Sequence, residues 1–167
     1  HIDPDPLDLL GDPTVPGTLA FEFANAASGD NDNNTVSAII GDALRVQKDT
    51  TATMSAGRYY LTSLTVDNNG ELRADVSDGP VIIYLSGSMS MATGSTMTLL
   101  GGAASDFRIY ANSSDPDTID CSPKSDLACF VYAPDMLVHM QPNGNLVGGV
   151  WGGTVEIWPG GNIFIDE

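Results

Sequence analysis

Three oxygen-bearing residues near the N-terminus have the spacing of a calcium loop. Asp30, Asp32 and Asn34 alternate within the segment DNDNNT, and Ca²⁺ prefers several oxygen ligands from one tight loop. The full motif continues with Gly at the sixth loop position and Glu at the twelfth, where this chain has Thr35 and Gly41. The segment therefore predicts either a calcium site or a solvated turn in which Asn and Asp bond to their own backbone.

The two cysteines, Cys121 and Cys129, lie eight residues apart in a polar stretch. The sequence around them offers no further Cys or His to complete a zinc site. In an exported protein such a pair forms a local disulfide, which we predict here, with two free thiols as the alternative.

Catalytic chemistry finds little support in the sequence. His139 is the one histidine in the body of the chain, and no Ser or Cys beside it has the setting of a nucleophile. A β-helix that cleaves polysaccharide needs carboxylates clustered with Arg or Lys on one face, whereas the six basic residues here are scattered. We predict that the chain is not an enzyme and needs no cofactor, with calcium as the alternative.

Aromatic side chains gather toward the C-terminus. Such residues commonly fill and close the last layer of a fold, but they also stack on sugars or anchor a protein partner. The candidates for partner contact are Tyr132, His139, Trp151 and Trp158.

The elements that position these residues are short strands. Between residues 137 and 165, alternating apolar segments are broken by Asn-Gly and Pro-Gly-Gly turns, and the same pattern occurs upstream. Units begin near residues 44, 64, 89, 137 and 155, and a period near 20 residues is typical of a solenoid. We predict an all-β, single-domain β-solenoid, parallel β-helix-like, of about 4–6 short coils, with a β-sandwich as the alternative.

The remaining segments fit around this repeat. Residues 1–17 contain four prolines and predict an extended lead-in or linker. The solenoid domain is expected over 18–167, with residues 18–43 as an N-terminal cap that contains a short strand over 19–23. A helix or a strand is expected over 35–44. The long interval before residue 137 indicates either two coils or a loop inserted at 112–128.

The composition limits the classes of partner. Apolar residues make up 42% of the chain, and the net charge is −16, which repels nucleic acid and anionic membrane surfaces. No stretch approaches the roughly 20 apolar residues of a membrane helix, and no signal peptide is present. Because the chain begins His1-Ile2-Asp3-Pro4 without Met, we expect a mature or excised fragment with any anchor upstream.

From residue 57 onward the chain resembles a β-solenoid domain of bacterial pilus-assembly proteins with prepilin-like N-termini and of related surface proteins. The resemblance rests on AGRYYLTSLTV (56–66), GPVIIYLSGSMSM (79–91), FRIYA (107–111), FVYAPDMLVHMQPNGNLVGGVWGGTVEI (130–157) and GGNIFIDE (160–167). It implies a non-enzymatic, extracellular structural or adhesive role on a bacterial surface. The expected partners are other pilus or surface subunits or a surface glycan, and the fragment itself makes no membrane contact. The alternative is a carbohydrate-binding or polysaccharide-cleaving β-helix.

Overall fold

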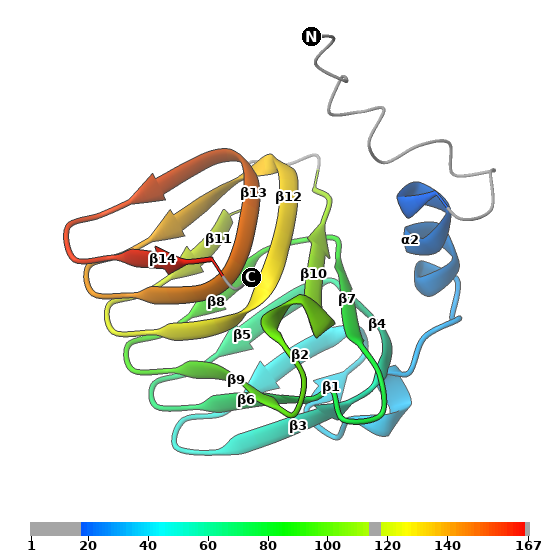
Figure 1. Ribbon diagram of the computed structural model, residues 1–167. Coiled ribbons are helices and arrows are strands. Elements are labelled where there is room, and N and C mark those ends of the chain that lie inside the picture. The colour runs from blue at the N-terminus through cyan, green and yellow to red at the C-terminus, as the bar shows by residue number, and fades with distance from the viewer. Residues whose placement is uncertain (1–17, 114–117, 166–167) are drawn as a thin grey trace, which may run out of the picture.

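The chain folds into one curled sheet wrapped around an apolar core. The structure is a computed structural model that describes residues 18–113 and 118–165. Within these residues a single 14-stranded sheet accounts for most of the secondary structure (Figure 1). The sheet is mixed, because β1 (Ile39–Ile40) runs antiparallel to β2 while the other strand pairs are parallel. The all-β prediction is therefore confirmed, and the two packed sheets of a β-sandwich are not found in this part of the chain.

The parallel pairs form three ladders. The first ladder joins β2 (Ala43–Val46), β5 (Ser63–Val66), β8 (Met89–Met91) and β11 (Thr118–Cys121). The second joins β3 (Thr51–Ser55), β6 (Glu71–Asp75) and β9 (Thr96–Leu100), and the third joins β4 (Gly57–Leu61), β7 (Val81–Leu85) and β10 (Phe107–Ala111). The long strands β12 (Asp126–Met140) and β13 (Asn145–Ile157) bend, so that each contributes to all three ladders. Strand β14 (Asn162–Phe164) is the last strand of the second ladder.

Period-2 alternation supplies the core, because every second residue of each strand points inward. Register then places like side chains on top of one another. One inward row of the first ladder runs through Leu44, Leu64, Met89, Ile119, Val138 and Val155. All but the last of these are at most 1% exposed, so the ladders surround one continuous apolar column.

The corner between the first and second ladders repeats with little change. Six turns there are closed by a backbone hydrogen bond across four residues, at 47–50, 67–70, 92–95, 122–125, 141–144 and 158–161. The third residue of each has positive φ: Asp49, Asn69, Gly94, Lys124, Asn143 and Gly160. Asn, Asp and Gly tolerate this conformation best, which explains the Asn-Gly signals in the sequence. Gly94 occupies this third position, whereas Gly70, Gly144 and Gly161 occupy the fourth.

The structure corrects the inserted loop predicted at 112–128. Strand β11 lies inside that range and pairs in parallel with both β8 and β12, and the turn 122–125 is one of the six corners. The long interval therefore holds two turns of chain. Its polar composition misled the prediction because TIDC buries only alternate residues.

The N-terminal segment contains a helix where a strand was expected. Helix α2 (Leu19–Ala27) begins at Thr18, whose hydroxyl accepts a hydrogen bond from Phe21 N at 3.2 Å. Four alanines favour the helix, whereas the Phe-x-Phe spacing suggested a strand. The segment 35–44 is not helical beyond a 3-10 turn at Asn33–Thr35, because β1 and β2 follow it. The predicted lead-in over 1–17 lies outside the described residues.

A network on the outer surface of the second ladder links three successive strands. Glu71 accepts hydrogen bonds from Arg73 at 2.7 Å, from Thr98 at 2.9 Å and from Thr51 at 3.3 Å. The bond from Arg73 is the main reason that the pKa of Glu71 lies below its usual value. These contacts connect β3, β6 and β9 on the outside, where no apolar packing holds them.

Replacing Glu71 with Gln should produce a small, pH-dependent loss of stability. Because the folded pKa is lowered, the contribution of Glu71 is present above its unfolded pKa of about 4.3 and disappears as pH falls through the folded value. We expect a loss below about 1 kcal/mol at pH 7, since the pair is accessible to solvent. Urea unfolding at pH 7 and pH 3 tests this, and a difference that grows at pH 3 would contradict it.

Candidate interaction surface at the C-terminal end

The two ends of the sheet are finished differently. At the N-terminal end, β1 covers the edge of β2, and Asn33 covers the edge of β4 by accepting from Tyr60 N at 3.1 Å and donating to Tyr60 O at 2.7 Å. Val36, which is 4% exposed, packs under the core. This end is thus covered along two of its three ladders.

One of the three predicted calcium residues, Asp32, contributes to this cover. Asp30, Asp32 and Asn34 are exposed, and the Asp32 carboxylate accepts a hydrogen bond from Arg58 N at 2.8 Å. Across residues 18–113 and 118–165, no group of three or more His, Cys, Asp or Glu side chains is placed to hold a metal ion. The loop instead attaches to the edge of β4.

Calcium at this loop stays a prediction with a direct test. Binding to the folded state would raise the melting temperature by mass action. We expect addition of millimolar calcium and of EDTA to leave the melting temperature within about 1 °C, because Asp32 already bonds to Arg58. A rise of several degrees with calcium that Asp30→Asn abolishes would establish the metal site instead.

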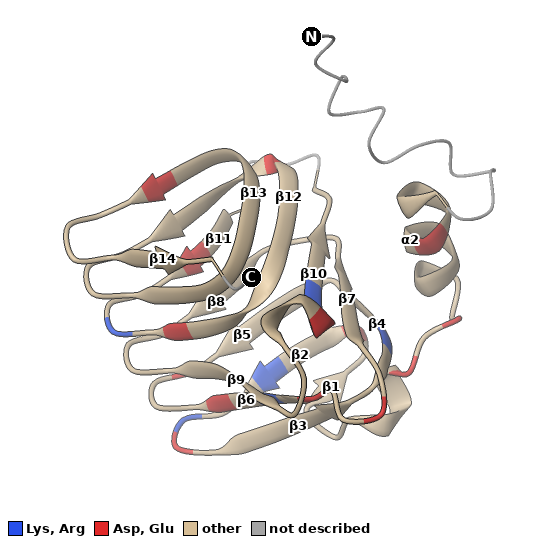
Figure 2. Cartoon of the chain, in the orientation of Figure 1, with Lys and Arg blue, Asp and Glu red and all other residues tan. Residues whose placement is uncertain are grey.

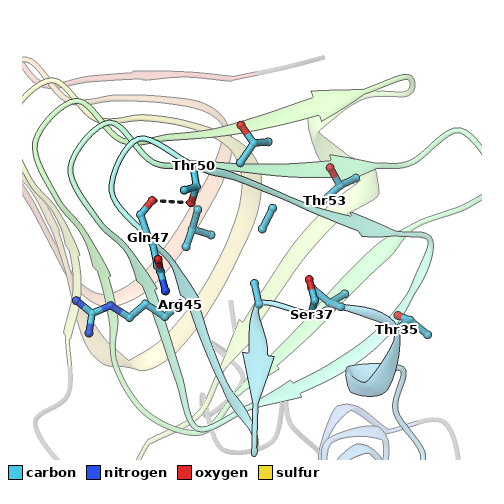
Figure 3. A pocket seen from close by; sticks show the side chains of 11 residues that line it. Thr35, Ser37, Arg45, Gln47, Thr50 and Thr53 are labelled. Carbon is cyan, nitrogen blue, oxygen red and sulfur yellow. Dashed lines mark hydrogen bonds between the residues drawn. The ribbon is translucent and has the colours of Figure 1, made fainter.

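A polar groove borders the one uncovered edge at the N-terminal end. It encloses about 340 Å³ between residues 35–38 and strand β3, and its lining includes Thr35, Ser37, Thr50 and Thr53 (Figure 3). The Thr50 hydroxyl donates to Gln47 O at 2.8 Å within the corner. The hydroxyl groups that line the groove and its one arginine, Arg45, do not form the arrangement of a nucleophile with an acid or base.

An aromatic row runs along the outer surface of the third ladder. Its members occupy the same register position in successive strands, in the order Tyr60, Tyr84, Tyr110, Tyr132 and Trp151. Neighbouring ring centroids from Tyr84 onward lie 6.0–6.3 Å apart, within the range of favourable aromatic pairs. Phe23 of α2 meets Tyr60 and Tyr84 edge-on. The row begins under the helix and ends at Trp151, which is 54% exposed.

The predicted contact residues therefore form two pairs on different ladders. Tyr132 lies beside Trp151 on the third ladder, and its buried hydroxyl has no hydrogen-bond partner within the described residues. Burial is the main cause that raises the pKa of Tyr132, with the nearby charge of Asp135 adding to it. His139 lies beside Trp158 at the end of the first ladder, with ring centroids 4.8 Å apart. The two pairs are connected along the chain through β12 and β13.

His139 stands in a polar outward row between two carboxylates. The register places Asp120 before it and Glu156 after it. Its Nδ1 lies 3.4 Å from Asp120 Oδ1, and Gln141 donates to the same carboxylate at 2.9 Å. Its Nε2 is buried without a hydrogen-bond partner in the described part of the chain. Asp120 and Trp158 therefore flank the imidazole ring at the end of the first ladder.

The two cysteines do not form the predicted disulfide. Both are free and buried, because they occupy inward positions of different ladders: Cys121 pairs with Met91 and Met140, and Cys129 pairs with Gly148. Burial raises the pKa of both thiols, that of Cys129 to about 12. At neutral pH they are protonated core side chains and are poor nucleophiles.

Exposed apolar side chains concentrate at the C-terminal end. Nine large apolar side chains are exposed in the described residues, and seven of these lie between residues 147 and 165. They are Val147, Trp151, Val155, Ile157, Trp158, Phe164 and Ile165. The same end is nearly free of charge, since Glu156 is the one charged residue between 141 and 165 (Figure 2). An apolar surface of this kind marks an interaction site.

Sequence reasoning missed two components of this surface. Val155 and Ile157 pair with the buried Val138 and Met140, but no described strand covers them on the other side. The aromatic row was also missed, although each strand of the third ladder repeats a triplet with an aromatic residue at its centre: YYL, IYL, IYA, VYA and VWG. Aligning those triplets would have placed the five rings in one row.

The curled sheet and its exposed apolar end define an all-β protein with a candidate interaction surface. The chain matches the family described as Domain of unknown function (DUF7305), over residues 16–102 and 79–167. The chain therefore belongs to this family. No curated protein and no solved structure gives a significant match. Among the described residues, no helix is long and apolar enough to span a membrane.

Proposed function

We propose that this chain is a β-solenoid that serves as a non-enzymatic structural or adhesive domain on the outside of a bacterial cell. The observation that carries the proposal is the register of the first ladder. Its inward row steps from Leu44 to Leu64, Met89, Ile119, Val138 and Val155, one turn of chain at a time. Six turns of chain stacked in this way bury a continuous column and resist bending, which suits a spacer or a display element.

Polar side chains on the outside support a structural role because they bond to the neighbouring coil. Asn145 donates to Asp126 at 2.7 Å, and Asn162 donates to Asn145 at 3.0 Å. Asn69 likewise donates to Asp49 at 3.0 Å. Side chains that bond to the neighbouring coil are not available to bind a ligand, and this favours a structural role.

The resemblance to pilus-assembly proteins supplies the proposed setting. In that setting the partners are other pilus or surface subunits, and a segment upstream of this chain provides the anchor. The net charge of −16 fits an extracellular protein that must remain soluble and avoid anionic membrane surfaces.

The stacked aromatic rings favour a protein partner over a glycan. Sugar binding by stacking needs an exposed ring face, but Tyr84 and Tyr110 are stacked on each other with an interplanar angle of 24°. Tyr84 is 3% exposed. Trp151 at the end of the row is the exception, since it is half exposed.

Two measurements separate the structural role from carbohydrate chemistry. On intact cells that express the full-length gene product, an antibody against residues 18–167 should label the surface, and external protease should remove the epitope. The purified chain should release no reducing ends from a panel of polysaccharides and bind no member of a glycan array. Turnover of any polysaccharide, or an epitope protected in intact cells, would overturn the proposal.

A further inference from the structure

The apolar core is left uncovered at the C-terminal end of the sheet. In the first ladder, Val138 is 1% exposed, whereas Val155, which pairs with it on β13, is 38% exposed. Likewise, Met140 is fully buried, whereas its partner Ile157 is 48% exposed. Side chains that elsewhere receive a further coil here receive none within the described residues. The surface formed by the seven exposed apolar residues of β13, β14 and their flanks, 147–165, is named here the end surface.

The end surface has nearly the area that a stable interface requires. A large side chain buries roughly 150–250 Å² when fully covered, so seven that are about half exposed leave on the order of 700 Å². A standard specific interface buries roughly 800 Å² on each partner. The exposed Gly153 and the partly exposed Gly149 and Gly152 add backbone to this area.

Strand β13 also offers an unprotected edge. Its residues 149–157 pair with β12 alone, because β14 pairs with residues 145–147. Natural edge strands are commonly protected by Lys or Pro, and β13 contains neither. The exposed apolar side chains and the unpaired edge of β13 both lie at this end of the sheet, so one partner can cover both.

We propose that the end surface is an interface between two copies of this chain, joined C-terminal end to C-terminal end about a twofold axis. Such an axis sets the two β13 edges antiparallel, the orientation in which a strand forms paired hydrogen bonds with its own copy. Two chains of charge −16 repel each other. Residues 141–165 carry one charge, Glu156, and Asp166 and Glu167 follow them in the sequence, so salt must screen these charges when two copies approach through this end.

The opposite end is a poorer partner for the end surface. The edge of β3 is polar, with Thr51, Thr53 and Ser55 alternating along it, and β1 and Asn33 cover the neighbouring edges. The exposed apolar side chain there is Ile40. A head-to-tail contact would therefore set Val155 and Ile157 against polar groups, whereas the twofold contact sets them against the same residues of the second copy.

The first test is the mass of the chain in solution as a function of concentration. Sedimentation equilibrium at micromolar concentration should give a monomer–dimer equilibrium that tightens when salt rises from 50 mM to 1 M, because salt screens the repulsion. Both tryptophans of the chain, Trp151 and Trp158, lie in the end surface. Dilution should therefore shift tryptophan emission to longer wavelength in parallel with dissociation. A monomer at all concentrations up to 100 µM would overturn the proposal.

A matched pair of substitutions locates the interface. Ile157→Lys places a charge in the end surface, and Ile40→Lys makes the same change at the opposite end, where Ile40 is 82% exposed. Ile157→Lys should raise the dimer dissociation constant at least tenfold, and Ile40→Lys should leave it unchanged. Circular dichroism melts of both variants confirm that each is folded. Equal effects of the two substitutions would overturn the assignment.

Cross-linking distinguishes the twofold dimer from a head-to-tail chain. Native cysteines do not interfere, because Cys121 and Cys129 are buried. In dilute solution, a bis-maleimide long enough to span strand β13 should join Ile157→Cys to its own copy, and it should not join Ile40→Cys to its copy. In an equal mixture, a product that joins position 157 to position 40 would overturn the proposed symmetry.

Discussion

Replacing Tyr84 with alanine should lower the free energy of unfolding by about 3 kcal/mol, as expected for removing a buried aromatic ring. Tyr84 is 3% exposed although it points outward from its strand, because helix α2 covers it. Its ring meets Phe23 at a centroid distance of 5.5 Å and Tyr110 at 6.0 Å. The variant thus loses both the contact with the helix and a central ring of the aromatic row. Chemical denaturation measures the loss.

The same variant should release helix α2 from the sheet. Phe23 is the aromatic contact between α2 and the third ladder, so amide exchange in residues 19–27 should accelerate in Tyr84→Ala. Tyr84→Phe keeps the ring and is the control. A double-mutant cycle with Phe23→Ala should give a coupling of about 1 kcal/mol. An unchanged exchange rate in α2 would show that the ring does not anchor the helix.

The strand content was predictable because it depends on local chemistry. Alternation places apolar residues inward, and Asn or Gly at a corner permits positive φ, so the units at residues 44, 64, 89, 137 and 155 could be located from sequence. The segments 64–66, 89–91 and 155–157 all lie in strands of the first ladder. Local signals of this kind do not require knowledge of what packs against them.

The errors occurred where distant contacts override local signals. Residues 118–121 are polar in sequence but pair with β8 and β12, and only that pairing reveals a strand. The sequence separation of eight residues suggested a disulfide, yet Cys121 and Cys129 belong to different ladders. Helix α2 was read as a strand because its apolar residues contact the aromatic row on the outside of the sheet, a surface that the sequence pattern did not reveal.

The candidate contact residues were located correctly in the chain, but their arrangement was not predictable. Tyr132 and Trp151 lie on the third ladder, and His139 and Trp158 lie at the end of the first. Which rings are stacked and which are exposed depends on the number of strands in the third ladder and on where α2 covers the row. Neither quantity follows from residue type.

Replacing Gly148 with alanine should destabilise the chain by about 3 kcal/mol, through backbone strain and a clash together. Gly148 has φ +133°, a region that residues with a Cβ rarely adopt. A Cβ built there would clash with the carbonyl oxygen of Cys129, its partner on β12. Since the obstacle is backbone, β13 must move away from β12 to admit a methyl group.

Gly29→Ala separates the two causes. Gly29 also has positive φ, +108°, but nothing lies within 4 Å of a Cβ at that position, so the substitution there introduces strain alone, about 1 kcal/mol. The excess for Gly148→Ala reports how closely the last coil packs on the one before it. Emission from Trp151 and Trp158 should shift to longer wavelength in Gly148→Ala, because both belong to the coil that is displaced. Equal losses of stability in the two variants would mean that β13 is free to move, and the end surface would then lack the rigid edge that self-pairing requires.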